Sequence, residues 1–96
     1  MTTSEVESKI AAAERSFDRA RDRVVELENA LRGAENNLER SAVEHHRERI
    51  RTQIRRVETD LASARGQLTD ARAALDEAWS LRKRQECQKP AGGQNA

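Results

Sequence analysis

The sequence predicts an all-α protein that forms a coiled coil, most favourably a long antiparallel helical hairpin. Three observations predict this class. Apolar residues recur alternately three and four positions apart, 36% of the 96 residues are charged, and the chain holds one proline. The spacing places the apolar side chains on one narrow stripe of a helix, which a single helix cannot bury. Each stripe must therefore pair with another helix.

The first predicted helix begins near residue 5. Ser4 and Glu7 fit a capping box, in which each side chain bonds a backbone amide of the first turn, so residues 1–4 are predicted to form an N-terminal cap. The first apolar stripe then consists of Ile10, Ala13, Phe17, Ala20, Val24, Leu27, Leu31, Ala34 and Leu38.

The second predicted helix carries a stripe with the same spacing, made of Ile50, Ile54, Val57, Leu61, Ala64, Leu68, Ala71, Leu75 and Ala78. Basic residues 82–84 suit the negative pole of a helix C-terminus, and the segment after Pro90 cannot continue a helix. The coiled-coil region is therefore predicted to cover residues 5–85, with residues 86–96 as a disordered C-terminal tail.

The two stripes differ in phase by two residues, and the break lies between Leu38 and Ile50. At about 100° per residue this slip moves the stripe by roughly 200°, to the opposite side of a continuous helix. Coiled coils absorb insertions of three or four residues rather than two. A chain reversal between residues 36 and 48 is therefore favoured, and one extended rod-like helix is the alternative.

Two positions for the turn remain open. Asn36 and Asn37 can end a helix, and Ser41 with Glu44 supplies a second capping box at which the next helix can start. A turn centred on His45 and His46 instead gives halves of nearly equal length. That second turn pairs Phe17 with Leu75, Val24 with Leu68, Leu31 with Leu61 and Leu38 with Ile54. Residues 40–50 contain neither glycine nor proline, which disfavours any turn there.

The composition argues against an enzyme, a cofactor or a metal site. Only 35% of the residues are hydrophobic and the aromatic residues are Phe17 and Trp79, too few to build a thick core around a pocket. The sequence has no Gly-x-Ser-x-Gly motif and no glycine-rich phosphate loop. His45 and His46 are adjacent and would point about 100° apart on a helix, whereas metal ligands share one face. Trp79 is interpreted as a packing cap at the open end of the bundle.

A cytoplasmic location is expected. No stretch approaches the roughly 18 apolar residues that span a bilayer, and the first residues lack the pattern of a secretory signal. Cys87 is the single cysteine, and an unpaired thiol suits a reducing compartment.

The apolar stripes predict a non-enzymatic coiled-coil interaction protein that acts as an adaptor, scaffold or spacer. Its expected partner is itself, as a dimer or higher oligomer, or another helical protein. The predicted interaction seam consists of Ile10, Phe17, Val24, Leu27, Leu31, Leu38, Ile50, Ile54, Val57, Leu61, Leu68 and Leu75.

The alternative function is association with nucleic acid through a basic band at residues 47–56. Arginine presents a planar donor fork to phosphate oxygens, although the band has no aromatic residue for base stacking. Its candidate phosphate-binding residues are Arg47, Arg49, Arg51, Arg55 and Arg56. The competing interpretation of this band is a solvated face, or one that pairs with an acidic segment of a neighbouring chain.

Overall fold

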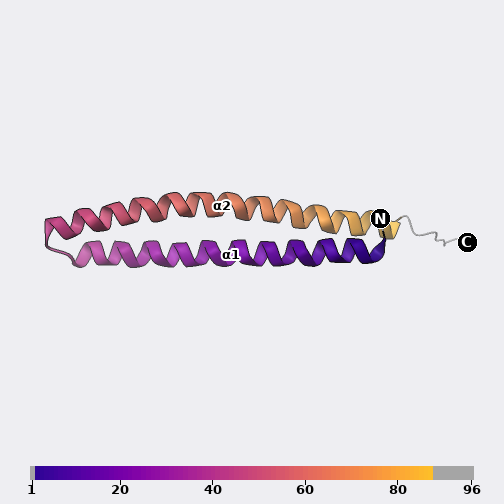
Figure 1. The fold of residues 1–96 in the computed structure, drawn as a ribbon, viewed down its shortest axis with the longest axis horizontal. Coiled ribbons are helices and arrows are strands. Elements are labelled where there is room, and N and C mark those ends of the chain that lie inside the picture. The colour runs from indigo at the N-terminus through magenta and orange to yellow at the C-terminus, as the bar shows by residue number, and fades with distance from the viewer. Residues whose placement is uncertain (1, 88–96) are drawn as a thin grey trace, which may run out of the picture.

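A computed structural model of the chain describes residues 2–87 and consists of two long helices. Helix α1 runs over Thr3–Arg40 and α2 over Glu44–Cys87, and the two lie side by side in antiparallel directions (Figure 1). The predicted all-α helical hairpin is confirmed, and a single continuous rod-like helix is not formed. At 1.5 Å per residue the hairpin is about 60–65 Å long. The start of α1 and the end of α2 lie together at the end of the hairpin opposite the turn (Figure 1).

The N-terminus of α1 lies two residues earlier than predicted. Thr2, not Ser4, is the capping residue: its hydroxyl accepts from the Glu5 amide at 3.1 Å, and the Glu5 carboxylate accepts from the Thr2 amide at 3.3 Å. The sequence offers the same hydroxyl-x-x-Glu spacing at both places. With the earlier start Val6 belongs to the second turn of α1 and continues the apolar stripe, where it is only 2% exposed.

The capping box also changes the acidity of Glu5. The Thr2 backbone amide and, after it, the Thr2 hydroxyl donate hydrogen bonds that lower the pKa of the Glu5 carboxyl below its ordinary value. A carboxyl whose pKa is lowered by folding contributes stability above its unfolded pKa and loses it as the pH falls through the folded value. The cap therefore supports the first turn at neutral pH and weakens in acid.

Residues 41–43 reverse the chain, within the interval 36–48. Ser41 adopts an extended backbone (φ −86°, ψ 127°) and caps α1 by donating its amide to the carbonyls of Asn37 and Leu38. Ser41 therefore serves the end of α1 and not the start of α2. The turn centred on His45 and His46 is wrong, because both residues lie inside α2. No described residue has a positive φ, so this turn needs no glycine.

Arg47 fastens the turn from the inside. It lies half-buried in the first turn and a half of α2, at the position that extends the second apolar stripe toward the turn. Its guanidinium donates to the carbonyl oxygens of Leu38, at 2.7 Å, and Ser41, at 2.9 Å. The last carbonyls of a helix have no partner within the helix, so a cation placed there satisfies them and opposes the negative end of the helix dipole. Arg47 thus joins the end of α1 to the beginning of α2.

The core is a thin layer between the helices, in two clusters. Near the middle, Val24 and Leu27 of α1 are buried against Leu61 and Ala64 of α2. Near the open end, Val6 and Ile10 are buried against Ala78. A further set of partly buried residues packs against the two clusters: Ala13, Leu31, Val57, Leu68 and Leu81.

Helix α2 continues to Cys87, two residues past the predicted end of the coiled-coil region at 85. Near this end Leu81 is half-buried while Arg82, the next residue of the strict seven-residue repeat, is exposed. A straight helix drifts by about 20° per heptad relative to that repeat, which explains the one-residue shift. The rest of the predicted tail, residues 88–96, lies outside the described residues.

The Arg47 contacts predict a specific loss of stability. Arg47→Ala removes two charge-assisted hydrogen bonds from carbonyls at the end of α1, and should lower the free energy of unfolding by about 1–2 kcal/mol. Arg49→Ala is the matched control, since it removes an exposed arginine two positions away and should change the free energy by less than about 0.5 kcal/mol. Urea unfolding followed by circular dichroism measures both. Equal effects of the two substitutions would show that Arg47 does not fasten the turn.

Candidate interaction surface

A single hairpin covers the predicted interaction seam incompletely. Ile10, Val24, Leu27 and Leu61 are buried. The other eight of the twelve predicted residues are only half-buried: Phe17, Leu31, Leu38, Ile50, Ile54, Val57, Leu68 and Leu75. The sequence interpretation missed Val6 and Leu81, although Val6 stands four positions before Ile10 and continues the spacing. The structure therefore leaves much of the apolar stripe in contact with solvent.

Three buried alanines contribute to this partial coverage. Ala34, Ala64 and Ala78 are each no more than 5% exposed, and small residues at a contact let two helix axes approach closely. A layer that is only two helices thick has no third element to cover the outer parts of larger neighbours. The half-buried residues thus follow from the architecture of the hairpin and not from a local defect.

One edge of the interface is lined almost entirely by charges, and we call it the charged side. It consists of Glu7, Glu14, Arg21, Glu28 and Glu35 of α1 with Glu44, Arg51, Glu58, Arg65, Arg72, Trp79 and Glu86 of α2. Arg65 and Glu28 form an ion pair across the two helices at 3.3 Å. Both side chains are exposed by more than a third, so the pair contributes at most about 1 kcal/mol.

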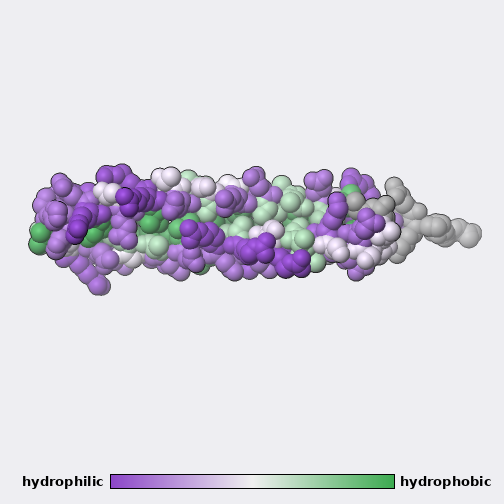
Figure 2. Space-filling view, viewed as in Figure 1, coloured by the Kyte–Doolittle hydropathy of each residue, from purple (hydrophilic) through white to green (hydrophobic). Residues whose placement is uncertain are grey.

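The opposite edge, which we call the weakly charged side, carries shorter and mostly uncharged residues. It consists of Lys9, Ser16, Arg23, Ala30 and Asn37 of α1 with His46, Gln53, Asp60, Gln67, Ala74 and Leu81 of α2. Short side chains cover a neighbouring apolar stripe less than the long stems of arginine and glutamate do. Figure 2 shows apolar side chains, in green, along the line between the helices on one face of the hairpin.

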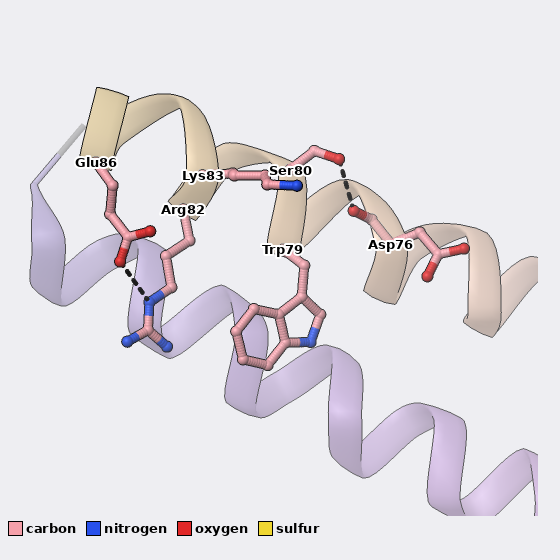
Figure 3. Close-up of a pocket in the computed structure, with 6 residues that line it drawn as sticks. All are labelled: Asp76, Trp79, Ser80, Arg82, Lys83 and Glu86. Atoms are coloured by element: carbon pink, nitrogen blue, oxygen red, sulfur yellow. Dashed lines mark hydrogen bonds and ion pairs between the residues drawn. The ribbon is translucent and has the colours of Figure 1, made fainter. Parts of the chain in front are cut away.

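Trp79 lies at the open end and is 44% exposed. Its indole is directed from α2 toward α1, and the guanidinium of Arg82 stacks 5.4 Å from the ring centroid (Figure 3). Arg82 also approaches Glu86 at 3.8 Å. The shallow hollow around the indole is lined by Asp76 and Glu86 as well as by Arg82 and Lys83, so its charges balance and select no class of ligand.

The structure separates the five arginines of the basic band. Arg47 is turned inward to the carbonyls of the turn, Arg51 pairs with Glu44 at 2.9 Å, and Arg55 donates to the Thr52 hydroxyl at 3.3 Å. Within residues 2–87, Arg49 and Arg56 are exposed and form no ion pair. The band is therefore not one continuous phosphate-binding surface.

The remaining chemical groups are isolated. His45 and His46 have ring centroids 6.1 Å apart, and no three potential metal ligands come together in the described part of the chain. Cys87 is an exposed free thiol. Neither α1 nor α2 contains a stretch apolar and long enough to cross a bilayer.

Comparisons with protein-family models, with curated proteins and with solved structures find no match to this chain. The feature with the clearest chemical meaning is the half-buried part of the seam.

The difference in burial predicts a difference in mutational cost. Leu61 is 3% exposed and Leu68, one heptad later in the same stripe, is half-buried. At low protein concentration Leu61→Ala should lower the free energy of unfolding by about 3 kcal/mol, and Leu68→Ala by roughly half as much. Chemical denaturation at a fixed concentration measures both losses. Equal losses at the lowest concentration would contradict the partial coverage of Leu68 in the single hairpin.

Proposed function

We propose that this protein is a non-enzymatic coiled-coil interaction module that acts as an adaptor, scaffold or spacer. It associates with further copies of itself, as a dimer or higher oligomer, or docks on another helical protein. The observation that carries the proposal is the set of eight seam residues that the hairpin leaves half-buried. Burying such side chains against another helix is the ordinary way in which narrow apolar stripes are satisfied.

The free energy of burying apolar side chains favours association. Fully burying a leucine, valine, isoleucine or phenylalanine side chain is worth about 1.5–3 kcal/mol relative to leaving it exposed. Eight half-buried residues therefore retain several kcal/mol of burial that a partner helix can supply, from which the costs of lost translation, rotation and side-chain freedom are subtracted. A packed interface along the seam can offset those costs, because it buries apolar surface that the single hairpin leaves exposed.

The weakly charged side is the proposed contact surface. On the charged side a partner would have to displace or desolvate long charged side chains, including the Glu28–Arg65 pair. On the weakly charged side the charged residues are Lys9, Arg23 and Asp60, and most of the others are alanine, serine, asparagine or glutamine, which permit close approach of a third and a fourth helix. Such an arrangement converts the two-helix layer into a bundle with an enclosed core.

The non-enzymatic part of the proposal rests on the thinness of the fold. A two-helix layer supplies no wall that excludes water from a reacting group, and electrostatic catalysis needs such a protected site. The cytoplasm is the proposed location because a single exposed thiol, Cys87, suits a reducing compartment. Length and rigidity along the hairpin axis fit a spacer or scaffold.

The experiment is thermal unfolding of the intact chain over a hundredfold range of concentration, with mass measured by analytical ultracentrifugation. Self-association predicts a Tm that rises with concentration. Ala30→Glu with Ala74→Glu places two charges on the weakly charged side and should abolish the rise. Val25→Glu with Ala62→Glu is the matched control, because it adds the same charge to exposed positions beyond the charged side and should leave association intact.

Circular dichroism at the lowest concentration checks that all variants keep the helical content of the natural chain. A monomer whose Tm is unchanged across the range would refute self-association. Equal loss of association in the two variants would refute the weakly charged side as the contact surface.

A further inference from the structure

A hollow at the turn end of the hairpin has a chemistry that the interaction seam does not use. It is lined by Asn37, Arg40 and Ser41 from the end of α1 and by His46, Arg49 and Ile50 from the beginning of α2. These polar residues lie on the weakly charged side of the interface or directly outside it. Two arginines, a histidine, an asparagine and a serine therefore line one shallow depression.

The acidic residues near the turn lie elsewhere. Following the heptad positions, Glu35, Glu39, Glu44, Glu48 and Glu58 all fall on the charged side or directly outside it. On the weakly charged side, the two rows of residues between Glu26 and Asp60 contain no carboxylate: Ala30, Gly33, Asn37, Arg40, His46, Arg49, Gln53 and Arg56. In the turn region the carboxylates thus lie on the charged side, and the weakly charged side carries arginines without carboxylates. The net charge of the segment alone does not reveal this separation.

The two arginines of the hollow are available for a ligand. Within the described part of the chain, neither Arg40 nor Arg49 forms an ion pair, and both are exposed. Arg47, between them and the turn, is held by the carbonyls of Leu38 and Ser41 and fixes the ends of both helices. The hollow is therefore lined by two arginines, Arg40 and Arg49, whose guanidinium groups are not engaged in an ion pair within the described residues.

We propose that this hollow binds phosphate groups of a nucleic-acid backbone. The planar forks of Arg40 and Arg49 each match the oxygens of one phosphate, and His46 and Asn37 supply further donors. Arg56 lies two helical turns beyond Arg49, about 10 Å along the same row, and reaches a third phosphate of an extended strand. The hollow has no aromatic platform for bases, so binding does not depend on sequence.

A nucleic-acid backbone fits better than a membrane surface. By heptad position, Arg56 follows Arg49 in the same row of α2, and a row of cationic side chains suits a linear array of phosphates. Among the described residues of the turn end, Val43 is the one large apolar side chain that is mostly exposed, at 54%. One valine offers little apolar surface for insertion among lipid headgroups.

The test uses the intact chain and a fluorescently labelled DNA duplex of about 20 base pairs, with binding followed by fluorescence anisotropy. With about three phosphates contacted, affinity should fall on the order of 40-fold when the salt rises from about 50 to about 200 mM. Arg40→Gln with Arg49→Gln should weaken binding at least tenfold and reduce the slope of log affinity against log salt by about two.

The matched control is Arg32→Gln with Arg72→Gln, which removes the same charge from exposed positions on or beside the charged side. This control should change affinity less than threefold. Arg40→Lys with Arg49→Lys retains the charge and loses the donor forks, so it should bind with intermediate affinity. Circular dichroism and the urea midpoint establish that each variant remains folded.

Equal losses in the two glutamine variants would overturn the site, because they would indicate general attraction to a polyanion. Absence of duplex binding by the natural chain at about 50 mM salt would also overturn it. Two further probes distinguish other sources of phosphate. Pyrophosphate or phosphatidylserine vesicles that bind to Arg40 and Arg49 while the duplex does not would refute the nucleic-acid assignment. These outcomes are separate from the concentration dependence of unfolding, which tests the seam.

Discussion

The structure depends on one constraint, the pairing of two narrow apolar stripes that have different phases along the chain. Because the phase changes by two residues between Leu38 and Ile50, a continuous helix would present the stripes on opposite sides. Reversal at residues 41–43 lets them face each other. Arg47 stabilises this reversal, since its guanidinium donates to the carbonyls of Leu38 and Ser41 at the end of α1.

The same constraint determines what the surface offers. Two helices bury one stripe each but have nothing to cover the outer parts of Phe17, Ile54 or Leu75, which remain half-buried. The rows beside the stripes then decide where a partner can approach. Long charged side chains occupy one edge, and the Glu28–Arg65 pair crosses between the helices there. The other edge carries mostly uncharged residues, and at the turn it has a hollow lined in part by Arg40 and Arg49.

The architecture could be predicted from sequence because heptad spacing is a strong and repetitive signal. The ends of the helices could not be predicted as well, because Thr2 with Glu5 and Ser4 with Glu7 have the same spacing, and the structure forms the Thr2–Glu5 capping box. The position of the turn could not be predicted, because the contact of Arg47 with the carbonyls of Leu38 and Ser41 is not visible in the sequence. In the sequence Arg47 belongs to a basic band that is typical of a solvated face. Nothing in the single hairpin explains why glycine stands at positions 33 and 66 inside the two continuous helices, as a Cβ at either position would meet open space.

The candidate site shows the same division. The composition indicates a positive band at residues 47–56, but it does not show which arginines already have partners. In the structure Arg51 and Arg55 donate to Glu44 and Thr52 of their own helix. The sequence pattern does not indicate Arg40, because this residue belongs to α1 and lies near Arg49 only after the chain reverses. Once the antiparallel pairing is known, the heptad positions assign each charged residue to one side of the interface. They then place Arg40, Arg49 and Arg56 on or beside the weakly charged side.

The most direct test of the account is the distance between the two helices within one molecule. Spin labels at Asp18 and Thr69, in a Cys87→Ser background and diluted with unlabelled protein, report this distance by pulsed electron resonance. Both positions are exposed on the outer part of the charged side, on opposite helices. The hairpin predicts a label separation of about 15–25 Å, whereas one continuous helix places the positions about 75 Å apart. A distance beyond about 60 Å would contradict the reversal and, with it, the pairing of the stripes.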